Sequence, residues 1–389
     1  MMYKNMKFDN WATATTNSDE FAETITALTN AGRWEAGLVS KDLVTQAIDG
    51  PINAPEVEER CKCDEETAFD TCENSHLLMK VGLDTYCVRN TAIPSLFDTA
   101  KIQGSALGRL EPASLSEVVN RCLQVAKGSS LILFRAGKIT AIMSDNAGGY
   151  RIMPQKDLLE IALEKITKRF GFPDFKSGVV DHAVSTFVVE LPNAQKRLND
   201  IYNGVIRPSG RTLELMPAVI FSTSDTGRSA ATLKPVFRLM NDNFYYPINN
   251  GLRVDHIRSK DKDADGLEKF AKLAGELHAK FNETQETIGR MAQTVLNYPL
   301  NAYIAIAKKI GVAQKYAKSG YEDLEAYCGG APCSAHDVYL SLTRCFDAAA
   351  INGSSNSVRL ALEDAVARVL TLRWEDYDLP GVVSWGKAA

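Results

Sequence analysis

The stretch from Leu131 to Lys165 constrains the fold of this chain more than any other. Its first part holds two apolar runs on either side of Gly137, and its last part carries apolar residues at helical spacing after Pro154. Apolar runs closed by a short glycine-containing loop are typical of a β-hairpin, and a recurrence every three or four positions is typical of an amphipathic helix. The stretch therefore predicts two paired strands followed by a helix that packs on them.

Both patterns recur along the chain. β-rich runs cover residues 179–191, 213–221 and 235–240, and most of them are joined by short loops rather than by helical crossovers. From Gly266 onward helical periodicity dominates and predicts one long amphipathic helix to about Val295. We therefore expect an α+β protein, with an antiparallel β-rich core and packed helices followed by an α-helical C-terminal region.

The net charge of −4 hides an uneven distribution. Residues 1–100 carry a net charge of −9, residues 101–262 one of +8 and residues 263–389 one of −3. A basic middle region favours an anionic partner, of which nucleic acid is the usual one. The alternative is that the acidic first hundred residues pack against it.

A chain of 389 residues can bury more than one core, so roughly two or three domains are expected. The changes in charge and periodicity predict an acidic N-terminal region at residues 1–105, a basic α/β core at 106–262 and a helical region at 263–389. The first residues contain no apolar signal segment, and no run approaches the roughly 20 apolar residues that span a bilayer. We expect a cytoplasmic location and no membrane partner.

The eight cysteines are scattered, which favours reduced thiols over a disulfide framework. Cys61, Cys63, Cys72 and His76 fall within sixteen residues, but their spacing matches none of the common zinc patterns. Buried or unreactive thiols are the preferred interpretation, with zinc as the alternative. We expect no metal and no other cofactor.

Several short motifs follow one another along the chain: Ser144-Asp145, Tyr150-Arg151, Asp157 to Leu159, Phe221 to Gly227, Arg238-Leu239 and Arg253 to His256. In this order they resemble the landmarks of the phage- and plasmid-borne family labelled domain of unknown function 932. The resemblance covers about residues 90–370. The chain departs from the family at Met240 to Asn243, where a Cys-Thr-Asn-Gly-like segment is expected, and at an inserted spacer from Asn146 to Gly149. The resemblance implies a protein of mobile elements without an established activity.

Basic residues of the middle region alternate with the aromatic residues Phe237, Phe244, Tyr245 and Tyr246. Cations that neutralise phosphates, beside aromatic rings that stack on bases, are what single-strand binding requires. The alternative places the aromatic rings in the core and the cations on several faces. The candidate nucleic-acid-binding residues are Arg135, Lys138, Arg151, Arg207, Arg211, Arg228, Lys234, Arg238, Arg253 and Arg258.

The polar loop at residues 222–228 fits a hydrogen-bonded turn better than a phosphate site. No arrangement of residues amounts to a catalytic signature, so we expect a nucleic-acid-binding accessory protein of a phage or plasmid, for single-strand binding or annealing. One alternative is a structural protein without enzymatic activity that forms homo-oligomers. The other is an enzyme of unassigned reaction, for which Asp145, Asp225 and His256 are the first residues to test.

Overall fold

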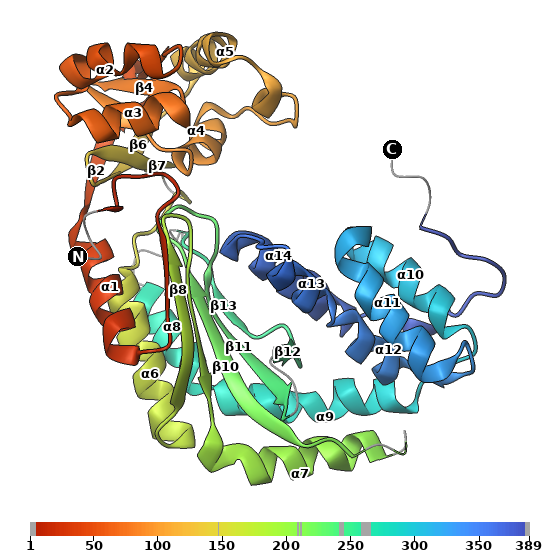
Figure 1. The fold of residues 1–389 in the computed structure, drawn as a ribbon. Coiled ribbons are helices and arrows are strands. Elements are labelled where there is room, and N and C mark those ends of the chain that lie inside the picture. The colour runs from red at the N-terminus through yellow and green to blue at the C-terminus, as the bar shows by residue number, and fades with distance from the viewer. Residues whose placement is uncertain are drawn as a thin grey trace.

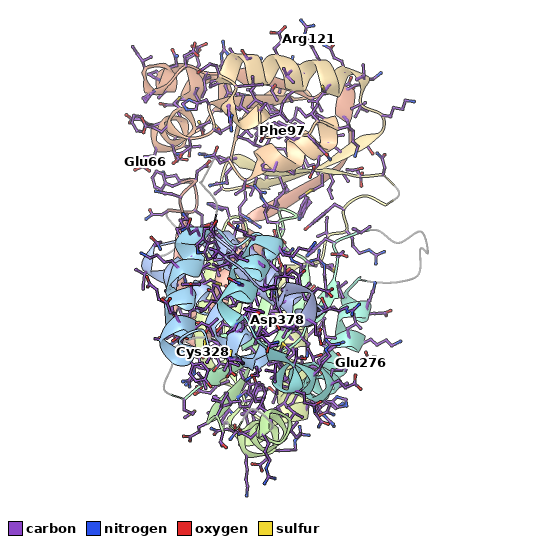
Figure 2. The ribbon with its side chains drawn as sticks, turned by 90° about the vertical axis from the view of Figure 1, so that its right-hand side faces the viewer. Glu66, Phe97, Arg121, Glu276, Cys328 and Asp378 are labelled. Carbon is purple, nitrogen blue, oxygen red and sulfur yellow. The ribbon has the colours of Figure 1, made fainter. Side chains whose placement is uncertain are left out.

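The computed structural model describes residues 5–146, 148–207, 210, 212–240, 245–257 and 266–385. The chain is an α+β protein in which two β-sheets with their own helices lie one above the other (Figure 1). Figure 2 shows the same division from the side, with Glu66, Phe97 and Arg121 in the smaller unit and Glu276, Cys328 and Asp378 in the larger one. The expected fold class is confirmed.

The smaller unit is built on a six-stranded sheet in the order β2-β6-β7-β5-β4-β3, in which only β5 and β7 pair in parallel. Its strands are β2 (Gly32–Val39), β3 (Val44–Ala47), β4 (Leu77–Val81), β5 (Asp84–Val88), β6 (Ser129–Arg135) and β7 (Lys138–Ser144). Its helices are α2 (Ala54–Cys61), α3 (Glu65–Glu73), α4 (Ala92–Ala100) and α5 (Pro112–Val125).

The hairpin predicted around Gly137 is confirmed as β6 and β7. Ala136 and Gly137 form its turn with φ angles of 47° and 79°, the left-handed conformation that a tight hairpin turn requires. The hairpin pairs with β2 and β5, which lie before residue 100. The domain boundary predicted at residue 105 therefore does not separate two sheets, because strand pairing joins segments from both sides of it.

The larger unit is built on a seven-stranded antiparallel sheet in the order β1-β8-β9-β10-β11-β12, with β13 also paired to β11. Its strands are β1 (Ala12–Thr15), β8 (Asp174–Asp181), β9 (Ser185–Glu190), β10 (Leu215–Thr223), β11 (Ala231–Leu239), β12 (Tyr245–Pro247) and β13 (Leu252–Val254). The helices in contact with it include α1 (Ser18–Asn30), α6 (Gln155–Phe170), α7 (Gln195–Ile206), α8 (Gly266–Gly275) and α9 (Leu277–Gln293).

Both faces of this sheet are covered, and β10 is buried at every one of its nine positions. On one face, Val219 and Phe221 belong to the large core that also contains Leu158 of α6 and Phe270 of α8. On the other face, Ile220 lies in a smaller apolar cluster. Helices cover that second face as well, which places α14 (Asn356–Val369) beside the strands (Figure 1).

The C-terminal region is mainly helical, as expected. It contains β14 (Val295–Leu296), α10 (Pro299–Ile310), α11 (Gln314–Cys328), β15 (Cys333–Ser334), α12 (Ala335–Leu342), α13 (Cys345–Ile351) and α14. The single long helix predicted from Gly266 to about Val295 is wrong in one respect, because α8 ends at Gly275 and α9 begins at Leu277. Glycine is a poor helix former, which accounts for the break in the helix after Gly275. The apolar periodicity continues across this break.

Candidate functional site

The loop between β10 and β11 is a hydrogen-bonded turn. The Ser224 hydroxyl accepts from the backbone N–H groups of Thr226 at 3.0 Å and Arg228 at 3.1 Å, and it donates to the Ala183 carbonyl oxygen at 2.5 Å. Serine side chains that bond the following backbone are a common way to close a turn. The loop is therefore held from within, and it leaves the Arg228 side chain exposed at its end.

A pocket of about 170 Å³ lies between this loop, β11, β13 and the first turns of α14. Three of the ten predicted cations, Arg228, Lys234 and Arg253, line it. Its walls also carry hydroxyl groups and one carboxylate, from Ser222, Ser229, Thr232, Ser357 and Asp364. We call this group of residues the α14 pocket. It brings together side chains from parts of the chain more than one hundred residues apart.

The three cations of the α14 pocket differ in whether a neighbouring carboxylate neutralises their charge. Lys234 is buried and forms ion pairs with Asp364 and, at 3.7 Å, with Glu363. Arg253 donates from Nε to Asp255 at 2.8 Å, but both side chains are about half exposed, and such pairs contribute little. Arg228 forms no ion pair with the residues that the structure describes. The positive charge open to a ligand therefore comes from Arg228 and Arg253.

Helix α14 adds a further electrostatic contribution. Its N-terminal residue is Asn356, its cap is Ser355, and Ser357 in its first turn lines the pocket. The N-terminus of a helix carries a partial positive charge and unpaired N–H groups, which favour anions. Two exposed guanidinium groups, several hydroxyls and this helix end together favour a phosphate-like anion.

Two of the predicted binding residues lie inside the protein. Arg135 donates from Nη2 to Asp225 at 2.6 Å, and its side chain is 1% exposed. Lys138 is fully buried and pairs with Asp9 at 3.1 Å and with Asp70. Their charges are compensated by internal carboxylates, so they do not contribute to a surface for nucleic acid.

The remaining predicted cations do not extend the α14 pocket. Arg238 pairs from Nε with Glu190 at 2.6 Å, and Arg151 is half-buried. Arg207 is exposed, but it follows α7 near the start of β10, whereas Arg228 follows the end of that strand. Nine residues of strand span roughly 30 Å, so these two arginines lie at opposite ends of the sheet. Arg211 and Arg258 lie outside the described residues.

The aromatic residues predicted to stack on bases belong mostly to the core. Phe237 and Tyr246 are each 2% exposed. Tyr245 is half-buried and donates its hydroxyl to Glu190 at 3.0 Å, and Phe244 lies outside the described residues. The described aromatic residues of this segment therefore offer no platform for base stacking.

Between the two units lies a buried network of charged groups that the sequence did not suggest. Arg89 is fully buried and donates to the backbone oxygens of Met6 and Phe8 at 3.0 and 2.9 Å, and to the His182 Nε2 atom at 2.7 Å. Asp9 pairs with Arg89 at 3.3 Å as well as with Lys138. We call this network the joint; it consists of Asp9, Asp70, Arg89, Lys138 and His182.

The pKa shifts in the joint follow from its burial. Removal from water, followed by the charges of Arg89 and Arg135, lowers the pKa of His182 to about 2. Burial also lowers the pKa of Arg89 to about 10, against the favourable effect of Asp9. Burial raises the pKa of Asp9 although two cations act in the opposite direction. The joint therefore holds a neutral imidazole against a buried guanidinium, which is a structural rather than a ligand-binding arrangement.

The three residues proposed for an enzyme are occupied by internal contacts. Asp145 accepts from the Gly37 N–H at 2.8 Å, and Asp225 pairs with Arg135. The His256 ring stacks on Tyr150 with 5.2 Å between ring centres, and burial lowers its pKa. Asp225 and His256 are both buried. No substrate-sized opening brings these groups together in the pockets found among the described residues.

The cysteines give no metal site. Within the described residues, no group of three or more His, Cys, Asp or Glu side chains is arranged to hold a metal ion. The cluster of Cys61, Cys63, Cys72 and His76 considered from the sequence is thus not assembled as a zinc site. All eight cysteines are free thiols.

Comparison of the chain with protein-family models, with curated proteins and with solved structures finds no match. The resemblance to the family labelled domain of unknown function 932 therefore stays a prediction. In the part of the chain that the structure describes, none of the helices is both long enough and apolar enough to cross a membrane.

Proposed function

We propose that this protein binds single-stranded nucleic acid by holding backbone phosphates at the α14 pocket, as an accessory protein of a phage or plasmid that acts in the cytoplasm of its host cell. The observation that carries the proposal is the convergence of Arg228, Lys234 and Arg253 with the N-terminus of α14 in one polar pocket. Pockets that enclose a drug-sized ligand measure roughly 300–1,000 Å³. The α14 pocket, at about 170 Å³, suits one phosphate group of a longer ligand.

The proposal attributes affinity to charge and not to base recognition. Phosphate contacts release counterions, so the logarithm of the binding constant falls with the logarithm of salt by about 0.7 per neutralised phosphate on a single strand. The two cations with exposed charge, Arg228 and Arg253, are the ones expected to set this slope. Lys234, paired inside the pocket, positions Asp364 and Glu363.

The test is fluorescence anisotropy with a labelled oligothymidylate at several salt concentrations. The double variant Arg228→Ala with Arg253→Ala should bind more weakly and lower the salt slope by about 1.4, because two phosphate contacts are lost. Arg207→Ala is the matched control, since it removes an equally exposed arginine at the far end of the sheet and should leave the slope unchanged. Binding that is absent at low salt, or equally weakened by Arg207→Ala, would refute the proposal.

A further inference from the structure

Three cysteine thiols converge in the smaller unit, away from the α14 pocket. Cys61 ends α2, Cys63 lies in the link to α3, and Cys87 lies on β5. The Sγ atoms of Cys63 and Cys87 are 3.9 Å apart, and Cys61 also forms a thiol contact with Cys87. This distance excludes a disulfide bond and allows a thiol–thiol hydrogen bond. Sequence spacing alone did not indicate this group, because Cys87 lies on β5, 24 residues after Cys63.

Local structure explains why the two cysteines of the Cys-Lys-Cys segment meet the same partner. Lys62 adopts the left-handed conformation, with φ at 51°, and thereby ends α2 and turns the chain toward α3. Helix α2 packs on β5, so both flanking thiols lie against that strand. The Cys63 backbone N–H donates to the Glu58 carbonyl oxygen at 3.3 Å. A short link of this kind can adjust by the small movement that closing a disulfide needs.

The thiols differ in access. Cys61 and Cys63 are partly exposed and line a pocket of about 560 Å³, whereas Cys87 is fully buried behind them. Lys7 and Lys62 also line this pocket. Lys7 pairs with Asp64 and Glu66, and Lys62 lies 3.5 Å from Asp84 in an exposed pair. A small molecule that enters the pocket meets Cys63 before Cys87.

We propose that Cys63 and Cys87 form a site of reversible thiol–disulfide exchange, oxidised by a low-molecular-weight disulfide such as glutathione disulfide. Cys63 is the thiol that the oxidant reaches, and Cys87 is the buried partner that completes the bond. The site is independent of the nucleic-acid binding proposed above.

The hydrogen bonds of the cluster favour a thiolate at Cys87, the partner that completes the bond. Hydrogen bonds from the Cys61 and Cys63 thiols, with smaller contributions from Thr71 and the charge of Lys138, lower the pKa of Cys87 to about 3 against the effect of burial. The same contacts raise the pKa of Cys63. Cys63 therefore keeps its proton until it meets the oxidant.

The exchange balances in two steps. In the first, Cys63 gives its proton to solvent and its sulfur attacks the oxidant, which forms a mixed disulfide and releases one glutathione thiolate. In the second, the Cys87 thiolate attacks the Cys63 sulfur and expels the second glutathione as a thiolate. The oxidant gains two electrons and the protein loses them. The Sγ atoms must then approach from 3.9 Å to the disulfide bond length of about 2.05 Å.

The experiment exposes the full chain to glutathione disulfide, alkylates the remaining thiols and maps the linked peptides by mass spectrometry. One disulfide between Cys63 and Cys87 should form, and the other six of the eight cysteines should stay alkylated. Added reduced glutathione should reverse it. A different pairing, or full alkylation of both residues under all oxidant concentrations, would overturn the proposal.

Variants separate the two steps. In Cys87→Ser, glutathione should accumulate on Cys63, because the second step has lost its nucleophile. In Cys63→Ser, no internal disulfide should form. Because Cys63 is partly exposed, this variant still tests the proposal if the substitution of the buried Cys87 prevents folding. Cys122→Ser on α5 is the matched control and should give the same disulfide as the unaltered chain. A disulfide that persists in Cys63→Ser would contradict the assignment.

Discussion

His182 should make the stability of this protein fall as the solution becomes acidic. The imidazole is 3% exposed and accepts a hydrogen bond from Arg89, and its pKa in the folded chain is about 2. In the unfolded chain the pKa returns to its ordinary value of 6.5. Since the folded pKa is depressed, the unfolded state binds the proton first. The contribution of His182 is therefore complete above about pH 6.5 and is lost as the pH falls toward 2.

The magnitude follows from the gap between the two pKa values. Each pH unit below the unfolded pKa costs about 1.4 kcal/mol of unfolding free energy, as long as the folded state stays unprotonated. At about pH 5, which is roughly 1.5 units below that value, the cost is about 2 kcal/mol. Other groups titrate in this range as well, so the effect must be isolated by comparison with a variant.

His182→Gln supplies that comparison, because its amide oxygen can accept from Arg89 but does not titrate. Urea unfolding of both proteins at about pH 7.5 and 5 should show that the unaltered chain loses about 2 kcal/mol more than the variant. His278→Gln, which removes a histidine of α9 outside the joint, controls for loss of any imidazole. Equal losses in the unaltered chain and in His182→Gln would refute the assignment of a neutral, buried His182.

Two substitutions test the packing of the units. Lys138→Met removes the cation that pairs with Asp70 and one of the two that pair with Asp9, and it should lower the free energy of unfolding by about 3–5 kcal/mol, measured by urea titration; a loss below about 1 kcal/mol would contradict the ion-pair assignment. Gly178→Ala should cost about 1–3 kcal/mol, measured by thermal or urea unfolding, because an added Cβ would overlap the Phe21 ring of α1. An unchanged stability of this variant would show that α1 does not lie against β8 as described.

The predictions that succeeded depend on short-range patterns. The hairpin around Gly137 and helix α6 follow from turn chemistry and from periodicity over a few residues, and both are present. The prediction of one helix from Gly266 to Val295 was wrong at Gly275, because the spacing of apolar residues does not show where the helical backbone is interrupted. The domain boundary at residue 105 stays a prediction. Strands on either side of it pair in one sheet, and amino-acid composition does not indicate which strands pair.

The residues of the candidate site were likewise predictable only in part. Composition indicated that the middle of the chain is rich in cations, but it could not indicate their partners. Arg135 and Lys138 belong to the same basic region as Arg228, yet each pairs with a carboxylate far away in the sequence: Asp225 is 90 residues from Arg135, and Asp9 is 129 residues from Lys138. The cations that remain at a shared surface, Arg228 and Arg253, meet the first turn of α14 only through the packing of that helix on the sheet.

By itself, the sequence determined the fold class, the hairpin of β6 and β7 and the helical character of the last third of the chain. These features depend on interactions between residues a few positions apart, which periodicity and turn residues encode directly. Only the tertiary structure decided which charges are buried, which line a pocket and which thiols meet. Burial and pairing of a side chain depend on elements brought together by the folded core. For that reason the ten predicted cations include two, Arg135 and Lys138, whose buried ion pairs hold the units together. Two others, Arg228 and Arg253, keep an exposed charge beside α14.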